Sequence, residues 1–117
     1  MKAKELMIGD WVCTEHDSTP RQIDWIRTGE VGLLWNKVVT PPYLVPIPIT
    51  VEILDKNGFV YNAIPFVDGW EQFGLTLYRG GNGYRIDCGI NVSLIIESVH
   101  ELQHALRLCG IEKTIEP

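Results

Sequence analysis

Hydrophobic and polar residues alternate along the first forty residues at the period of a β-strand. Leu6–Cys13 carries a Gly-Asp turn that is followed by a Trp-Val pair. Further on, hydrophobic residues stand at every second position on each side of a Thr-Gly-Glu turn: Ile23, Trp25, Val31, Leu33 and Trp35. Alternation of this kind between glycine turns predicts a half-buried antiparallel sheet.

The Ile-Gly-Asp-Trp-Val stretch that opens this series resembles the start of an SH3-like barrel, in which a charged turn precedes the first long strand. We therefore expect residues 1–40 to form an SH3-like antiparallel β-barrel. The next segment, residues 41–49, contains Pro41, Pro42, Pro46 and Pro48. Because proline cannot donate to a central ladder, this segment is expected to be an extended edge or a connector.

A short helix is predicted over residues 50–58. Thr50 is a suitable N-cap, Glu52 favours the helix dipole, and Asn57-Gly58 gives a stop signal. Residues 59–96 then alternate again around an Arg-Gly-Gly-Asn-Gly run, which predicts a β-meander with a hairpin at that run. A glycine-rich run can also cradle phosphate, but that geometry needs a helix directly after it, and here a strand is predicted.

The last predicted element is a helix over residues 98–110. Ser98 and Glu101 have the spacing of a capping box, and Gly110 provides a C-terminal stop. At about 100° per residue, five apolar residues form one stripe that is expected to pack on the sheet: Val99, Leu102, Ala105, Leu106 and Cys109.

Together these elements predict a single α+β domain spanning residues 1–117. With 117 residues, of which 45% are hydrophobic, the chain is long enough to bury a core without a disulfide or a metal. No apolar run approaches the roughly 18 residues needed to span a bilayer, and the N-terminus lacks a signal-peptide core. We therefore expect a cytoplasmic protein with no membrane partner and no cofactor.

The net charge and the cysteines narrow the classes of partner and chemistry. A net charge of −5 argues against nucleic acid or an acidic membrane as a partner. Cys13, Cys88 and Cys109 are odd in number and form no C-x-x-C pair, so they are expected to be reduced thiols.

The C-terminal helix contains the pattern H-E-x-x-H, formed by His100, Glu101 and His104. In zinc proteases the two histidines at i and i+4 bind the metal, and the glutamate acts as a general base on the bound water. This gives one hypothesis, a zinc-dependent hydrolase. Its third ligand would have to come from His16, Asp87 or Cys88.

Two features of the same helix argue against this hypothesis. The longer form of the motif fails, because Arg107 and Gly110 stand where a glycine and a third histidine are required. Both histidines also lie opposite the apolar stripe, where they are expected to face water, and Glu101 already has a capping role. We therefore interpret the pattern as a chance match and predict no metal site and no enzymatic activity.

Three blocks of the chain carry recognisable motifs, in order: MKAKELMIGDWV, PIPITVEILDKNGF and VHELQHALRLCGIE. They resemble the outline of a family of small uncharacterised bacterial and prophage proteins. That outline is an N-terminal L-x-I-G-N/D-W/Y-V, a central P-I-P-L-T-x-E-x-L-x-x-x-G-F and a terminal V-H-x-L-Q-N/H. In that outline the positions of Glu101 and His104 are often glutamine and asparagine. The resemblance implies a phage-like or mobile-element context and no established activity.

The tryptophans supply the second hypothesis. Trp11, Trp25 and Trp35 fall in the predicted barrel, where they would form an aromatic binding groove or fill a small β core. Because the alternation favours core positions, the groove is the less favoured of the two interpretations. The function predicted overall is a non-enzymatic accessory or interaction module whose partner is another protein or a second copy of the chain.

Overall fold

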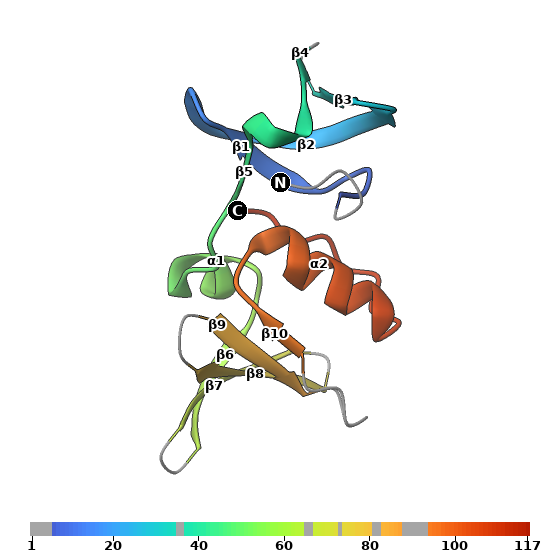
Figure 1. Ribbon diagram of the computed structural model, residues 1–117. Coiled ribbons are helices and arrows are strands. Elements are labelled where there is room, and N and C mark those ends of the chain that lie inside the picture. The colour runs from blue at the N-terminus through green and yellow to red at the C-terminus, as the bar shows by residue number, and fades with distance from the viewer. Residues whose placement is uncertain (1–5, 35–36, 65–66, 73, 81–82, 88–93) are drawn as a thin grey trace. The chain divides into compact units, whose positions relative to one another are not determined.

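The computed structural model describes residues 6–34, 37–64, 67–72, 74–80, 83–87 and 94–117. The chain divides into two compact units. The N-terminal unit comprises residues 1–47 together with Pro117, and the C-terminal unit comprises residues 48–116. The sequence expectation that all 117 residues fold as one domain stays a prediction. The described part of the N-terminal unit contains antiparallel strands, and the C-terminal unit contains antiparallel strands with two α-helices. The chain as a whole is therefore α+β (Figure 1).

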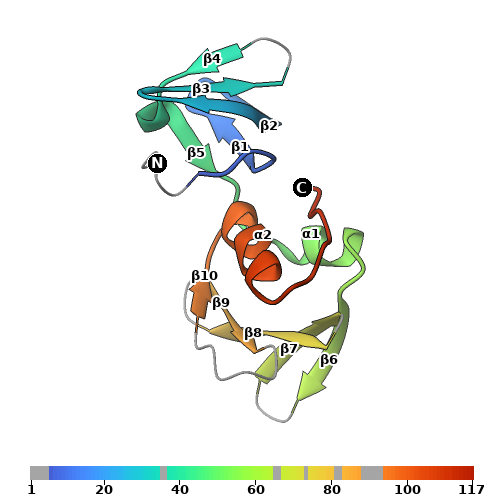
Figure 2. The same cartoon turned by 90° about the vertical axis from the view of Figure 1, so that its right-hand side faces the viewer.

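The N-terminal unit is a five-stranded antiparallel sheet in the order β4-β3-β2-β1-β5 (Figure 2). Its strands are β1 (Trp11–Thr14), β2 (Asp17–Arg27), β3 (Glu30–Leu33), β4 (Lys37–Val39) and β5 (Leu44–Pro46). A short 3₁₀ helix at Pro41–Tyr43 precedes β5. Among the described strands no pairing joins the two edges, β4 and β5, so the sheet is not closed into the predicted barrel.

The expectation that the segment 41–49 is an extended edge or a connector is confirmed for the edge, because Leu44–Pro46 pair with β1 as the edge strand β5. Proline is tolerated there because an edge strand has one side without ladder bonds. The strand β2 begins at Asp17, six residues before Ile23, the first residue of the expected alternation.

The start of β2 is fixed by one carboxylate. Asp17 Oδ1 accepts from the Thr19 main-chain N–H at 2.9 Å, and Oδ2 accepts from Arg21 at 3.3 Å. The bond from Thr19, followed by that from Arg21, lowers the pKa of Asp17 to about 2. These bonds lie within the first five residues of β2.

The core of the N-terminal unit is apolar and contains six buried residues: Leu6, Val12, Ile23, Val31, Leu33 and Leu44. A buried carboxylate organises the chain that enters it. Asp10 Oδ2 accepts from the Met7 main-chain N–H at 2.7 Å, which closes a turn whose third residue, Gly9, has a φ of +92°. The main-chain groups of Gly9 and Asp10 then bond Ile23 at 2.8 Å each. The Gly-Asp pair of the sequence is thus the anchor of the first strand.

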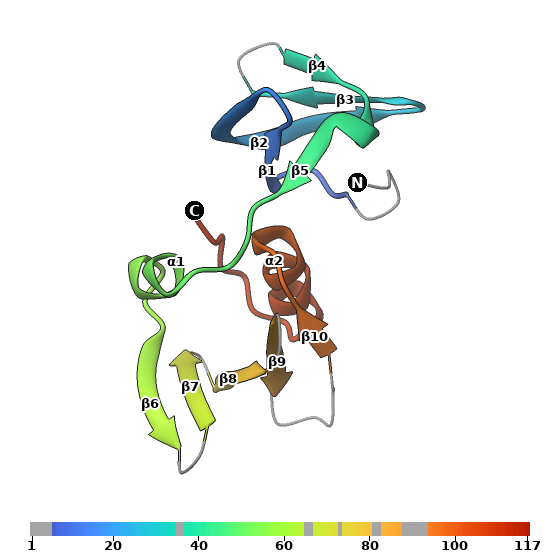
Figure 3. The same cartoon turned by 60° about the vertical axis from the view of Figure 1, so that its left-hand side comes forward.

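The C-terminal unit is a five-stranded antiparallel meander in the order β10-β9-β8-β7-β6. Its elements are α1 (Val51–Lys56), β6 (Val60–Ile64), β7 (Val67–Gln72), β8 (Leu75–Gly80), β9 (Gly83–Asp87), β10 (Leu94–Ile96) and α2 (Val99–Leu108). Figures 2 and 3 show both helices over the same side of this sheet. The core between them is made of buried aliphatic residues: Leu54, Leu75, Leu77, Ile86, Ile96, Leu102 and Leu106.

Both helices end in the same C-terminal motif. The Gly58 and Phe59 N–H groups bond to the carbonyls of Asp55 and Leu54, and Gly58 has a φ of +86°. In α2 the corresponding residue is Gly110, with a φ of +76°, and the next residue bonds back to Leu106. These are Schellman caps, in which a left-handed glycine satisfies the last helical carbonyls and reverses the chain.

The start of each helix is only partly as expected. Thr50 Oγ1 accepts from the Ile53 N–H at 3.2 Å, which is the predicted N-cap. The capping box of α2 is wrong in detail, because Ser98 accepts no N–H of the first turn. Its hydroxyl donates to Glu101 Oε1 at 2.8 Å instead, and the same carboxylate oxygen accepts from the Glu97 N–H at 3.3 Å.

Among the residues that the structure describes, no helix has the length and apolar character needed to cross a membrane.

The left-handed cap of α2 gives a stability prediction. Gly110→Ala should lower the free energy of unfolding by about 1 kcal/mol, because an L-residue in this conformation is strained by roughly that amount. The matched control is Gly80→Ala, since Gly80 is not left-handed and an added Cβ there meets nothing within 4 Å. Urea denaturation of both variants checks this, and equal losses would contradict the conformational explanation.

Candidate functional site

The three tryptophans predicted to bind occupy different positions in the N-terminal unit. Trp11 in β1 is half-buried, and its indole Nε1 is buried without a hydrogen-bond partner among the described residues. Trp25 in β2 is also half-buried. Trp35 lies outside the described residues. A groove lined by all three side chains therefore stays a prediction, and Trp25 is the residue for which the structure gives a defined setting.

A β-bulge turns Trp25 away from the core. Ile23 pairs with Leu33, whereas Trp25 pairs with Gly32, so the register shifts by one residue at Asp24. Ile23 is 1% exposed and belongs to the core cluster. Without the bulge Trp25 would follow Ile23 onto the same face, because residues i and i+2 of a regular strand share a face. The expectation that Trp25 continues the buried row is therefore wrong.

The indole of Trp25 lies over Gly32 of the neighbouring strand. A Cβ built on Gly32 would stand 2.0 Å from both Cε2 and Nε1 of the ring, so no larger residue fits beneath it. The guanidinium carbon of Arg27 lies 4.5 Å from the ring centroid. An arginine at this distance is attracted by the ring quadrupole and restricts the orientation of the ring.

The next strand extends this surface with an exposed aliphatic side chain. Gly32 pairs with Val38 of β4, which is 54% exposed, so these positions share a face with Trp25. We call the set Trp25, Arg27, Gly32 and Val38 the Trp25 platform. It combines a half-buried indole, one cation and one exposed valine on three adjacent strands.

Exposed hydrophobic side chains are concentrated in the unit that carries the platform. Seven of the eleven exposed large hydrophobic residues described belong to the N-terminal unit: Met7, Ile8, Ile26, Leu34, Val38, Tyr43 and Val45. Because single exposed apolar residues are normal, the informative feature is their accumulation on a unit of fewer than fifty residues.

The residues of the H-E-x-x-H pattern lie in the first two turns of α2. The expectation that both histidines face water is wrong for His100, which is 5% exposed, while His104 is half-buried. The two rings meet edge to face with centroids 5.7 Å apart. A helical wheel assumes one buried stripe, but the covered face of α2 also includes Gln103, so it is wider than the apolar stripe alone.

Hydrogen bonds give these residues a structural role at the start of α2. The Ser98 hydroxyl lies 3.0 Å from His100 Nδ1 and donates to Glu101 Oε1. Since the hydroxyl proton goes to the carboxylate, His100 Nδ1 is the donor in the other bond. Glu101 also accepts from the main chain, so its carboxylate is committed to the helix start.

No group of three or more His, Cys, Asp or Glu side chains in the described part of the chain is arranged to hold a metal ion. Of the third ligands considered, His16 and Asp87 are exposed and Cys88 lies outside the described residues. His100 and His104 therefore have the spacing of two zinc ligands. A catalytic zinc site requires a third protein ligand, and no such ligand is arranged beside them among the described residues.

Sequence reasoning missed an aromatic cluster in the second sheet. Trp70 is 2% exposed, and its ring meets Tyr61 and Tyr84 edge to face with centroids 5.4 and 5.7 Å away. The Tyr61 hydroxyl donates to Asp68 at 2.6 Å, and this bond raises the pKa of Tyr61. Arg79 lies 5.4 Å from the Trp70 ring. Because the indole is buried, we assign the cluster to packing between neighbouring strands.

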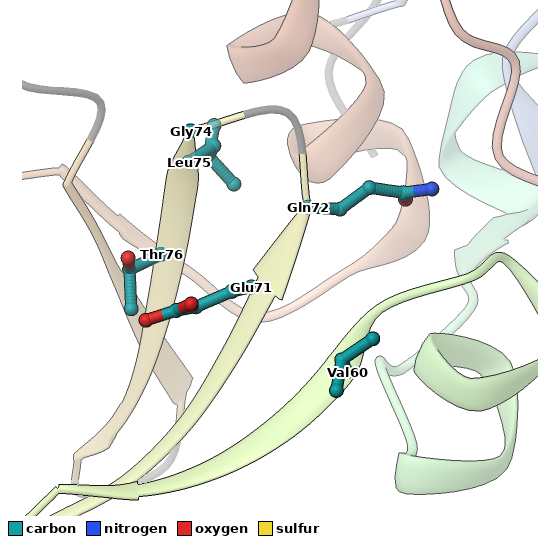
Figure 4. A pocket seen from close by; sticks show the side chains of 6 residues that line it. All are labelled: Val60, Glu71, Gln72, Gly74, Leu75 and Thr76. Carbon is teal, nitrogen blue, oxygen red and sulfur yellow. The ribbon is translucent and has the colours of Figure 1, made fainter.

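One surface pocket of about 470 Å³ lies at the β7–β8 turn (Figure 4). It is lined by Val60, Glu71, Gln72, Gly74, Leu75 and Thr76. Figure 4 shows the Glu71 and Thr76 side chains together, whereas Gln72 points in the opposite direction. Polar groups that diverge in this way cannot orient one ligand, so the pocket is not the candidate site.

A scan of protein-family models and searches of curated proteins and of solved structures found no match to this chain. The resemblance of its three blocks to small bacterial and prophage proteins therefore stays a prediction.

The position of Trp25 over Gly32 predicts a strong coupling between the two residues. Gly32→Ala should lower the free energy of unfolding by about 1–3 kcal/mol, because the new Cβ forces the indole off the sheet. In a Trp25→Ala background the same change should cost less than about 0.5 kcal/mol. A double-mutant cycle by chemical denaturation measures the difference. Equal losses in both backgrounds would show that the ring does not lie over Gly32.

His100 and Glu101 both bond to the Ser98 hydroxyl, and this predicts that the H-E-x-x-H residues bind zinc only weakly. Protein purified without tag or chelator should carry well under one zinc per chain, and His104→Ala should leave that content unchanged. Elemental analysis followed by a zinc titration checks both statements. One tightly held zinc per chain that is lost in His104→Ala would contradict this interpretation and favour the hydrolase hypothesis.

Proposed function

We propose that this chain is a non-enzymatic interaction module that binds another protein, or a second copy of itself, through the Trp25 platform. The N-terminal unit acts as an SH3-like sheet that presents the platform, and the partner is recognised by apolar contact with Trp25 and Val38. The phage-like or mobile-element context implied by the sequence resemblance belongs to the same proposal.

The observation that carries this proposal is the bulge at Asp24. A bulge costs one ladder position, and here its effect is to move a tryptophan from the core face to the outer face of the sheet. Tryptophan and arginine are both among the residue types enriched at the energetic centres of protein interfaces. Val38, exposed on the adjacent strand, supplies apolar area next to the ring.

The electrostatics favour a protein over nucleic acid as the partner. The platform holds a single cation, Arg27, whose guanidinium is placed at the Trp25 ring and whose neighbour across the strand pair is Glu30. Nucleic-acid binding draws on several phosphate-neutralising cations, and the chain as a whole carries a net charge of −5.

The roles of the block residues support a binding function over catalysis. Asp10 closes the first turn, Thr50 caps α1, and Gln103 bonds to the main chain of residues after α2. Each block that carries the family resemblance thus holds a residue needed to form the fold. None of these three side chains needs a catalytic role to account for its position.

Site-specific crosslinking tests the proposal. A photoreactive phenylalanine analogue at Val38 should capture a discrete partner, or a second copy, that mass spectrometry identifies. The same analogue at Leu108, which is 80% exposed on the other unit, is the matched control. In the protein that carries the analogue at position 38, Arg27→Ala should reduce the amount of crosslinked product several-fold.

Identical crosslinking profiles at positions 38 and 108 would overturn the assignment of the binding surface. Folding of each variant is checked by circular dichroism, so that a lost crosslink reports on the surface and not on unfolding.

A further inference from the structure

The segment after α2 has no regular secondary structure, although it is firmly held. Residues 111–116, which we call the closing segment, follow the left-handed Gly110 and belong to no helix or strand. Figures 2 and 3 show the segment running back from the end of α2 past α1. Its Ile115 side chain is nonetheless fully buried.

A glutamine of α2 makes two hydrogen bonds to the main chain of the closing segment. Gln103 is 5% exposed, its Nε2 donates to the Lys113 carbonyl at 2.7 Å, and its Oε1 accepts from the Ile115 N–H at 2.7 Å. A carboxamide that both donates and accepts in this way imitates the edge of a β-strand. The contact depends on an extended backbone in the segment.

An asparagine at the end of α1 makes the same kind of contact with the next residue. Asn57 is 6% exposed, its Oδ1 accepts from the Glu116 N–H at 2.8 Å, and its Nδ2 donates to the Glu116 carbonyl at 2.7 Å. The second N–H of the same amide is used by the Ile53 carbonyl, so the side chain is also tied to its own helix.

Side chains of the closing segment add sequence selectivity to these main-chain contacts. Ile115 is buried completely, and the Lys113 ammonium donates to the Asn57 carbonyl. Thr114, between them, is exposed. The site therefore selects an extended Lys-x-Ile-x segment, in which the first and third side chains are bound and the second is free to vary.

We propose that this site is an extended-peptide recognition site and that it exchanges its own closing segment for the identical segment of a second copy. The contacts are independent of the Trp25 platform and lie within the C-terminal unit. The left-handed Gly110 is the hinge for this exchange, and the hydrogen bonds at Lys113, Ile115 and Glu116 involve side chains and not a sheet ladder. Reciprocal exchange of one identical element gives a symmetric dimer.

The two carboxamides provide the driving force for refilling the site. When the closing segment leaves, Gln103 and Asn57 lose four hydrogen bonds in a largely apolar setting, and buried amides without partners are costly. Because both amides are at least nine-tenths buried, an equivalent segment from another copy is bound in its place.

Isotope mixing on the full-length wild-type chain tests the exchange. Equal amounts of ¹⁵N-labelled and unlabelled protein are warmed to just below the unfolding midpoint, cooled, and examined by native mass spectrometry. We expect mixed-isotope dimers. A peptide of residues 110–117 in excess should suppress them at least about tenfold, because it fills the same site.

Two control peptides make the test specific. The peptide with Ile115→Asp should not suppress the dimers, since a carboxylate cannot enter the buried position, whereas Thr114→Ala should suppress them like the natural sequence. Absence of mixed dimers, or dimers that the natural peptide leaves unchanged, overturns the proposal.

Hydrogen exchange on the wild-type protein gives a second, independent readout. If the closing segment detaches locally, the Ile115 and Glu116 amides should exchange at least about tenfold faster than the Leu102 and Leu106 amides of α2. Equal rates would show that the segment opens only when the whole unit unfolds, and this result also overturns the proposal.

Discussion

The fold depends on pairing main-chain groups in places where neither a helix nor a strand can pair them. Buried N–H and C=O groups must find partners, and irregular segments supply only some of them from within. In this protein single side chains do so: Asp10 receives the Met7 N–H, and Gln103 and Asn57 bind the closing segment. Each of these side chains is buried, so loss of any one leaves an unpaired main-chain group in the interior.

The same requirement explains why the two helices are short and yet well defined. The six-residue helix α1 is marginal by itself, because so few turns cannot offset the cost of nucleation. It is fixed at one end by Thr50 and at the other by a Schellman cap whose next residue, Phe59, is buried. Asn57 then joins the helix end to the closing segment. Tertiary contacts, and not helix propensity, hold α1 in place.

The H-E-x-x-H residues show how a sequence pattern known from catalytic sites can arise from residues with structural roles. Ser98, His100 and Glu101 form a hydrogen-bonded group at the start of α2, and the carboxylate also receives the Glu97 N–H. A glutamate three residues after a serine is common at helix starts, and a histidine beside it completes the pattern by position alone. Chemistry at this site requires a further ligand, whereas capping requires nothing more.

The Trp25 platform and the closing segment represent two different uses of irregular backbone. At Asp24 one extra residue re-aims a tryptophan, and beyond Gly110 a left-handed turn sends an extended segment across two helices. Both depend on glycine: Gly32 leaves room for the indole, and Gly110 reverses the chain. In each case a local departure from regular structure creates a surface with defined chemistry.

The sequence by itself determined the two helices with their C-terminal glycines, the N-cap of α1 and the meander. These features depend on interactions within a few residues of the chain, namely the hydrophobic period, the Thr50 cap and the left-handed glycines at 58 and 110. Local sequence patterns are therefore enough to predict them. Tertiary structure alone decided the face of Trp25, the burial of His100 and the partners of Gln103. A bulge shifts the face of every later residue without a sequence signal of its own, and Gln103 meets residues ten or more positions away. Such contacts depend on where the chain returns, which periodicity does not encode.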